Sequence, residues 1–201
     1  MKTTYVTLKP DMARAYRDKL KWMTRRVMVP QPPDWAENSY VDDDRNVIVF
    51  DGKSRPDCVH YERSLKYGKH DDQLILGTTW STLKNYDGLK PTDLEFGAPL
   101  WSYFDSNDKP DGYGKLRPGR FLPNKFRDQM PRETLKIVRA ERVQDITEDD
   151  AWNEGIDMGE VMEIPCSGPL GVAVFSRLWN SINAERGYSW DSNPWVWVLG
   201  W

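Results

Sequence analysis

The chain has 201 residues, 39% of them hydrophobic, which is enough to build the core of one large domain and argues against two independent ones. Its net charge of −3 argues against a protein coated in basic charge, and the sequence has no apolar run of about 18 residues to span a membrane. The polar N-terminal stretch does not fit a secretory signal, so we expect a soluble cytoplasmic protein. The two cysteines and two histidines are not spaced as metal ligands, so we expect no metal site and no cofactor. The sequence also has no G-x-S-x-G motif, so we expect no serine-hydrolase triad.

The first half of the chain predicts several strands and one helix. Residues 4–8 alternate between polar and apolar side chains, as in a strand. Asp11 can cap a helix that runs to about Leu20, with Met12, Tyr16 and Leu20 as its buried stripe. A strand over 22–29 should end at Pro30. Further strands are predicted at 46–50, 74–80 and 100–104, with a long loop at 53–72.

The second half predicts a strand, two helices and a final strand. Residues 134–143 alternate as a strand, with Leu135, Ile137 and Val143 facing inward. Thr147 and Asp150 form a capping-box pattern that opens a short helix, and Gly155 ends it. A second helix is expected at 172–184, and the apolar run 195–199 should be a central strand. This order predicts an α+β domain around a strongly curved sheet or small barrel.

Basic residues are concentrated in two parts of the chain. Six lie between Arg14 and Arg26 against one acid, and ten lie between Lys109 and Arg142 against four acids. In the second region aromatic residues are interleaved with basic ones, which suits contacts to a nucleic-acid backbone. The alternative is a solvated loop. The candidates for backbone contacts are Arg117, Arg120, Lys125 and Arg127.

Three stretches resemble the ASCH domain of the PUA-like superfamily, in a form common in phage genomes. The stretch from Lys19 to Arg26 resembles the family motif G-x-K-x-x-x-x-R, with Lys19 in place of the glycine. Residues 142–156 are similar to a phage block R-V-E-R-L-Q-D-I-S-E-E-D-A-x-x-E-G-I, and residues 178–198 are close to the usual ending of the family. One departure is clear: residues 76–80 lack the Arg and Glu of an R-E-T-W-like family segment.

The resemblance implies one PUA-like domain over residues 1–201, with flanking helices around a curved sheet or small pseudo-barrel and an insertion around 106–132. It also implies a cleft associated with RNA or modified nucleosides, in the host cytoplasm if the protein is phage-encoded. A related bacterial amidohydrolase family removes the acetyl group from N-acetylated cytidine with a Lys, a Thr three residues later and a distant Glu. That pattern matches Lys21, Thr24 and Glu154 here.

Three functional hypotheses follow for this cleft. The first is binding of RNA or a cytidine-like nucleoside, with Arg26 holding a phosphate or carboxyl group and Trp22 and Trp80 able to stack on a base. The second is hydrolysis of an N-acylated cytidine, with Thr24 as nucleophile, Lys21 as base and Glu154 as acid or orienting group. The third is RNA cleavage by Lys21 and a carboxylate. The structural alternative is an ordinary ion pair between Lys21 and Glu154.

Overall fold

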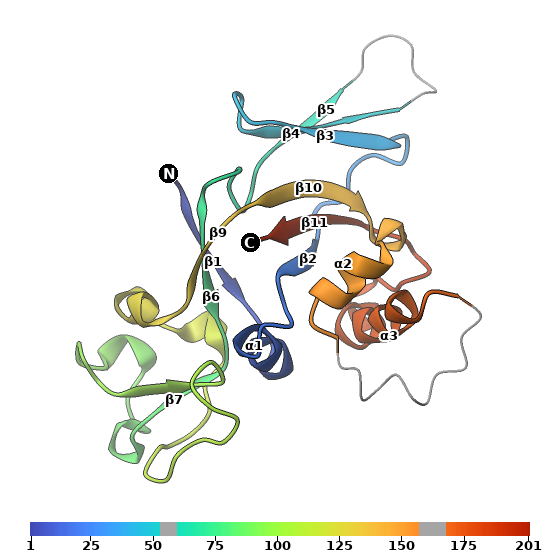
Figure 1. The fold of residues 1–201 in the computed structure, drawn as a ribbon. Helices are drawn as coiled ribbons and strands as arrows, with labels where there is room; N and C mark the ends of the chain where they lie inside the picture. The colour runs from blue at the N-terminus through green and yellow to red at the C-terminus, as the bar shows by residue number, and fades with distance from the viewer. Residues whose placement is uncertain (53–59, 157–167) are drawn as a thin grey trace.

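The computed structural model describes residues 1–52, 60–156 and 168–201. Over these residues the chain is α+β, as predicted, with three three-stranded sheets, one two-stranded sheet and three α-helices (Figure 1). Within the described ranges the sheets remain separate and do not close into a barrel. None of the helices in these ranges has the length and apolar character needed to cross a membrane.

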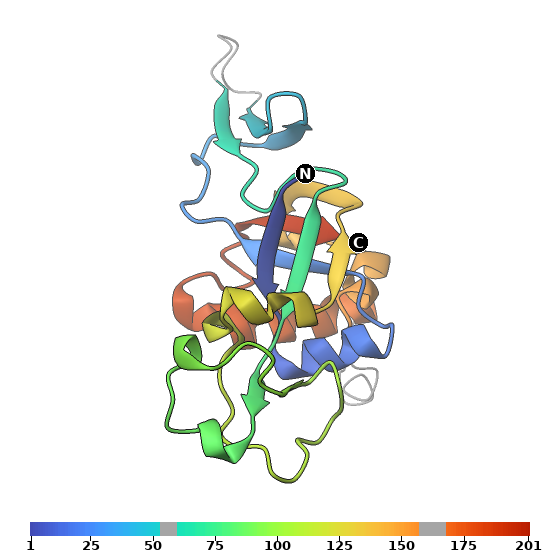
Figure 2. The same cartoon turned by 90° about the vertical axis from the view of Figure 1, so that its left-hand side faces the viewer.

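Two of the sheets form the centre of the molecule. One consists of β1 (Thr3–Thr7), β6 (Gln73–Gly77) and β9 (Arg132–Thr134), and the other of β2 (Met23–Val27), β10 (Ile137–Arg142) and β11 (Trp195–Gly200). β1 and β6 run parallel, whereas the other neighbours in both sheets are antiparallel. Figure 2 shows β1, β6 and β9 upright, with the second sheet crossing behind them. The apolar strand β11 is central in its sheet, as predicted.

The single strand expected at 134–143 is two strands, and this corner joins the two central sheets. β9 ends at Thr134 and β10 begins at Ile137, so the chain changes sheet at Leu135 and Lys136. Leu135 is fully buried at this corner. The strand expected at 74–80 is also broken, because Thr78 turns inward and its hydroxyl donates to the Leu8 carbonyl at 3.1 Å.

The two remaining sheets lie at opposite ends of the view in Figure 1. One contains β3 (Asn38–Asp42), β4 (Val47–Asp51) and β5 (Tyr61–Ser64), and the other contains β7 (Trp80–Thr82) and β8 (Leu100–Ser102). β3 was not predicted, and β5 corrects part of the loop expected at 53–72, of which 53–59 lie outside the described residues. The short strand β5 is anchored by the Tyr61 ring, whose centroid lies 6.0 Å from that of Phe50 on β4.

Helix α1 (Pro10–Arg17) begins earlier and ends earlier than the sequence predicts. Pro10 occupies the first turn, where its missing N–H costs nothing, so Asp11 lies inside the helix and does not cap it. Lys19 has a φ of 59°, a left-handed conformation that stops the helix. Leu20, predicted to belong to the buried stripe, therefore lies beyond the helix and is 59% exposed, while Ala13 and Ala15 are the buried helix residues.

Helices α2 (Glu148–Asn153) and α3 (Leu170–Asn183) form where the sequence predicts two helices. Thr147 caps α2, its hydroxyl accepting from the Asp150 N–H at 3.2 Å, as predicted. The Glu148 carboxylate then accepts from the N–H groups of Gly171 and Val172 at 2.7 and 3.1 Å, which fixes the start of α3 against α2. Within the described residues the short 3-10 helices are η1 (Lys84–Tyr86), η2 (Pro91–Asp93), η3 (Gly119–Phe121), η4 (Asn124–Gln129), η5 (Val143–Asp145) and η7 (Ala184–Arg186).

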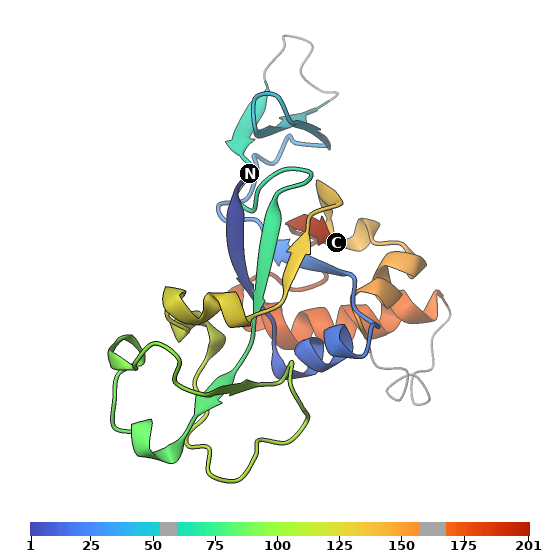
Figure 3. The ribbon, with the colours of Figure 1, turned by 60° about the vertical axis from the view of Figure 1, so that its left-hand side comes forward.

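Helices α1 and α3 lie at the same end of the central sheets in both Figure 2 and Figure 3. α3 is held there by a core in which Phe175 and Trp179 pack with Val196 and Val198 of β11. α1 packs through Ala13 with the β1–β6 side of the molecule. β2 runs between α1 and the α3 side of the molecule (Figure 1), and Thr24, Arg25 and Arg26 of this strand line a cavity there.

Candidate functional site

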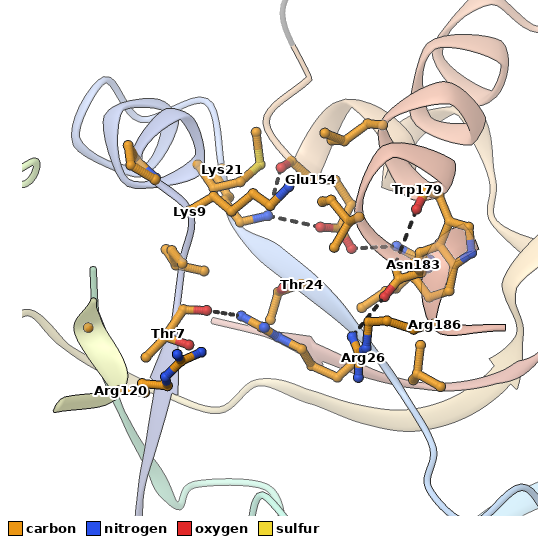
Figure 4. Close-up of a pocket in the computed structure, with 18 of the residues that line it drawn as sticks. Thr7, Lys9, Lys21, Thr24, Arg26, Arg120, Glu154, Trp179, Asn183 and Arg186 are labelled. Atoms are coloured by element: carbon orange, nitrogen blue, oxygen red, sulfur yellow. Dashed lines mark hydrogen bonds and ion pairs between the residues drawn. The ribbon is translucent and has the colours of Figure 1, made fainter. Parts of the chain in front are cut away.

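A cavity of about 580 Å³ opens where β2, the end of β1 and helices α1 and α3 meet. Residues far apart in the sequence line it, and Figure 4 shows how their side chains converge. The lining comes from segments 7–12, 24–29, 66–67, 118–120 and 175–186, together with Lys21, Thr79 and Glu154. The structure therefore places Lys21, Thr24, Arg26 and Glu154 on one cavity.

Lys21 and Glu154 form a buried ion pair at one wall of the cavity. The Lys21 Nζ donates to the Glu154 Oε2 at 2.9 Å and to the Glu154 backbone carbonyl at 2.7 Å. The side chains are 1% and 6% exposed, so water does not screen the pair. Burial lowers the pKa of Lys21 below its usual range, although the Glu154 carboxylate acts in the opposite direction.

Gly155 makes this close approach possible. It ends α2 with a φ of 78°, a backbone conformation that residues other than glycine rarely adopt. A Cβ at this position would lie 2.8 Å from the Cβ atoms of Ala15 and Lys21. Lys21 and Glu154 can consequently form an isolated antiparallel β-bridge, and the Trp22 N–H donates to the Asn153 carbonyl at 2.8 Å beside it.

Arg25 holds Glu154 from the side away from Lys21. Its guanidinium lies 3.3 Å from the Glu154 Oε1, 2.6 Å from Glu141 and 2.7 Å from Asp150. Burial alone would lower the pKa of Arg25, but the carboxylates of Glu154 and Glu141 raise it above its usual range. Each oxygen of Glu154 thus has its own cation, and the carboxylate is fixed in orientation.

Thr24 and Arg26 extend from β2 toward the cavity, as residues two apart on a strand should (Figure 4). The Thr24 hydroxyl forms no hydrogen bond with any described residue. Arg26 donates through its Nη2 to the Thr7 carbonyl, while its Nε is buried without a partner in the described part of the chain. Burial lowers the pKa of Arg26, but a guanidinium stays charged at neutral pH. Adjacent residues on a strand point to opposite faces, which predicts that only one of Arg25 and Arg26 reaches the cavity. This prediction is wrong, because Arg25 also contributes to the lining.

Positive charge dominates the cavity. Among the described residues that line it, Glu154 is the single acid against seven basic residues: Lys9, Lys21, Arg25, Arg26, Lys66, Arg120 and Arg186. Only Lys21 and Arg25 of these form ion pairs with described residues. Arg186 donates to the Asn183 side chain at 3.1 Å, and Lys66 lies over the Tyr67 ring at 5.2 Å. The remaining charge favours an anionic ligand.

The two tryptophans expected to stack on a ligand do not line this cavity. Trp80 is fully buried in a core cluster with Ile75 and Phe126. Trp22 is 45% exposed, but it lies outside the lining. The aromatic residues that do reach the cavity are Tyr67, Phe175 and Trp179. Neither His60 nor His70 is among the lining residues, and the described residues contain no group of side chains suited to a metal ion.

The predicted basic cluster is divided by the fold. Arg117 is only 6% exposed and donates to the carbonyls of Tyr86 and Leu89 at 3.1 to 3.2 Å, so it cannot contact a polynucleotide backbone. Lys125 is partly buried and donates to backbone carbonyls of 92 and 94. The Arg127 guanidinium lies 4.1 Å from the centre of the Tyr5 ring. Arg120 alone of the four is exposed and lines the cavity.

Sequence reasoning missed the basic residues that close the cavity, Lys9, Lys66 and Arg186. They precede α1, follow β5 and end η7, and no motif in the sequence marks them. Part of this lining could have been found from the sequence, because Asn183 and Arg186 lie inside the block 178–198 that resembles the family ending. Comparison with protein-family models, curated proteins and solved structures gives no match to the chain.

Proposed function

We propose that the cavity binds a phosphate-bearing nucleotide, free or as part of RNA. The observation that carries this proposal is the excess of cations over acids in a cavity that also has aromatic walls. Phosphate oxygens accept charge-assisted hydrogen bonds from arginine, and aromatic rings contact a base. Arg26 is the best placed residue, because its Nε has no partner among the described residues and its side chain reaches the cavity.

The resemblance to ASCH domains of the PUA-like superfamily supports the same proposal. In the family motif a glycine stands two residues before the lysine, and here Lys19 at that position has a φ of 59°. This is the left-handed conformation that glycine favours, so the backbone suits the motif even though the residue differs. Lys21, Thr24, Arg26 and Glu154 of the motif blocks then meet at one cavity.

A binding comparison between a nucleoside and its 5′-monophosphate tests the proposal. A charge-assisted hydrogen bond contributes about 1.5–3 kcal/mol, so cytidine 5′-monophosphate should bind at least about tenfold more tightly than cytidine in calorimetric titration. The same comparison with uridine, adenosine and guanosine would identify the base. Arg26→Gln and Arg186→Gln should each reduce the preference for the monophosphate. Arg45→Gln is the matched control, because Arg45 pairs with Glu62 outside the cavity. Equal affinities for nucleoside and monophosphate would contradict the proposal.

A second candidate, hydrolysis of an N-acylated cytidine, is favoured by the presence of Lys21, Thr24 and Glu154 on one cavity. Burial lowers the pKa of Lys21, which favours its neutral form as a base for the Thr24 hydroxyl on the same cavity. If Thr24 is the nucleophile, Thr24→Val and Lys21→Met should each abolish turnover, and the double variant should lose little more. Turnover that persists in Thr24→Val would exclude this role. RNA cleavage would depend on Lys21 and a carboxylate, and incubation with labelled RNA detects it.

A further inference from the structure

A second depression adjoins the cavity. It is more open, has a volume of about 690 Å³ and is lined by residues 90–92 and 120–125. Arg120 lines both the cavity and this depression, so the two share a boundary at this side chain. Figure 4 shows Arg120 beside Thr7 at the margin of the cavity.

The segment that separates the two hollows is held firmly by the core. A Cβ on Gly119 would lie 2.7 Å from the Thr78 carbonyl oxygen, so only glycine fits this approach. The Tyr5 hydroxyl donates to the Gly119 carbonyl at 2.9 Å, and Leu122 is 2% exposed in the core. Arg120 and Phe121, between these anchors, are consequently presented to solvent from a fixed backbone.

The chemistry of the depression suits a base and a phosphate. Phe121 leaves 53% of its surface exposed, and the Arg120 guanidinium lies 4.8 Å from the centre of its ring. Lys90 and Lys125 also line the depression, and no acid does so among the described residues. An exposed aromatic ring among cations is the arrangement with which proteins bind single-stranded nucleic acid, the ring stacking on a base and the cations contacting phosphates.

We propose that this depression is a subsite for the nucleotide next to the one in the cavity, so that the ligand is a single-stranded oligonucleotide. The inference rests on the proposed function of the cavity. Arg120 would contact the phosphate that links the two nucleotides, because it faces both hollows. Phe121 would stack on the second base. Most of the gain in affinity over a mononucleotide then comes from Phe121, which lines the depression and not the cavity.

The test measures affinity against ligand length. Wild-type protein is titrated with a nucleoside 5′-monophosphate and with 5′-phosphorylated di- and tetranucleotides of the same base, in ribo and deoxyribo forms. Base stacking on an aromatic side chain should make the dinucleotide bind roughly tenfold more tightly than the monophosphate. Phe121→Ala should remove this gain and leave monophosphate affinity unchanged. Phe96→Ala is the matched control, since Phe96 is 84% exposed and lines neither hollow.

The outcomes separate this inference from the function of the cavity. Monophosphate binding without any gain from a second nucleotide would overturn the subsite and leave the proposed function standing. A gain that Phe121→Ala reduces no more than Phe96→Ala would overturn it too. If neither monophosphate nor oligonucleotide binds, the function proposed for the cavity fails and the subsite fails with it.

Discussion

The buried pair of Lys21 and Glu154 should respond unequally to removal of its two charges. Glu154→Gln leaves the Lys21 ammonium 1% exposed, with Arg25 and Arg26 nearby and the backbone carbonyl of residue 154 as its remaining acceptor. Breaking a buried pair in this way costs about 3–5 kcal/mol of unfolding free energy. Lys21→Met leaves the Glu154 carboxylate with Arg25 at 3.3 Å, so we expect a smaller cost of about 1–3 kcal/mol.

Urea unfolding of the wild type, both single variants and the double variant measures these costs. Glu154→Gln should lower the midpoint more than Lys21→Met. The double variant should be more stable than Glu154→Gln alone, because it no longer buries an unpaired ammonium. Losses below about 1 kcal/mol in both single variants would refute the reasoning, since that is the range of exposed pairs. A double variant as unstable as the sum of the two would refute the coupling.

Further predictions concern the backbone, the helix contact and pH. Gly155→Ala should lower the unfolding free energy by about 1–3 kcal/mol in thermal unfolding and weaken ligand binding, because the residue has a left-handed φ and its new Cβ would press on Lys21. Gly187→Ala is the control, because Gly187 is also left-handed but has open space around it. Glu148→Ala should cost about 1–2 kcal/mol, because the Gly171 N–H loses its acceptor, whereas Glu185→Ala on the surface should cost nothing measurable in the same assay. The pKa of Lys21 is lowered, so its ammonium should lose its proton at a pH below the usual lysine range. Anion affinity that uses the ammonium should fall as pH rises through this value, whereas turnover that uses the amine should rise. Lys21→Met should remove either pH dependence in titrations across pH.

Local patterns predicted the parts of the fold whose partners are close in sequence. The Thr147 cap is visible because its acceptor and donor are three residues apart. The apolar run that became β11 is visible because a strand buried on both faces needs no polar alternation. The break between β9 and β10 was not visible, because a strand that changes sheet keeps its alternating pattern on both sides of the corner.

The candidate site was predictable only in part, for the same physical reason. Lys21, Thr24 and Arg26 lie on one short segment, whereas Glu154 entered through the family resemblance. The basic cluster could not be resolved from sequence, because the carbonyls that bind Arg117 come from residues 86 and 89 of a different segment. A tryptophan such as Trp80 has the same local pattern in a core as in a stacking site. The fold decides between these roles by burial.

Strand β2 places two adjacent arginines in opposite electrostatic environments, and this contrast is the strongest physical reason to expect an anionic ligand. Arg25 is surrounded by carboxylates although it also reaches the cavity lining: Glu141 on β10, Asp150 on α2 and Glu154 directly after α2. Arg26 faces the cavity, where its described partner is the Thr7 carbonyl. The Nε of Arg26 is buried without a partner among the described residues, so the side chain keeps a desolvation cost that a neutral carbonyl offsets only partly. A phosphate in the cavity would supply a negative charge beside Arg26. Phosphate binding should be stronger for this reason, because the desolvation cost of Arg26 is already present before the phosphate binds.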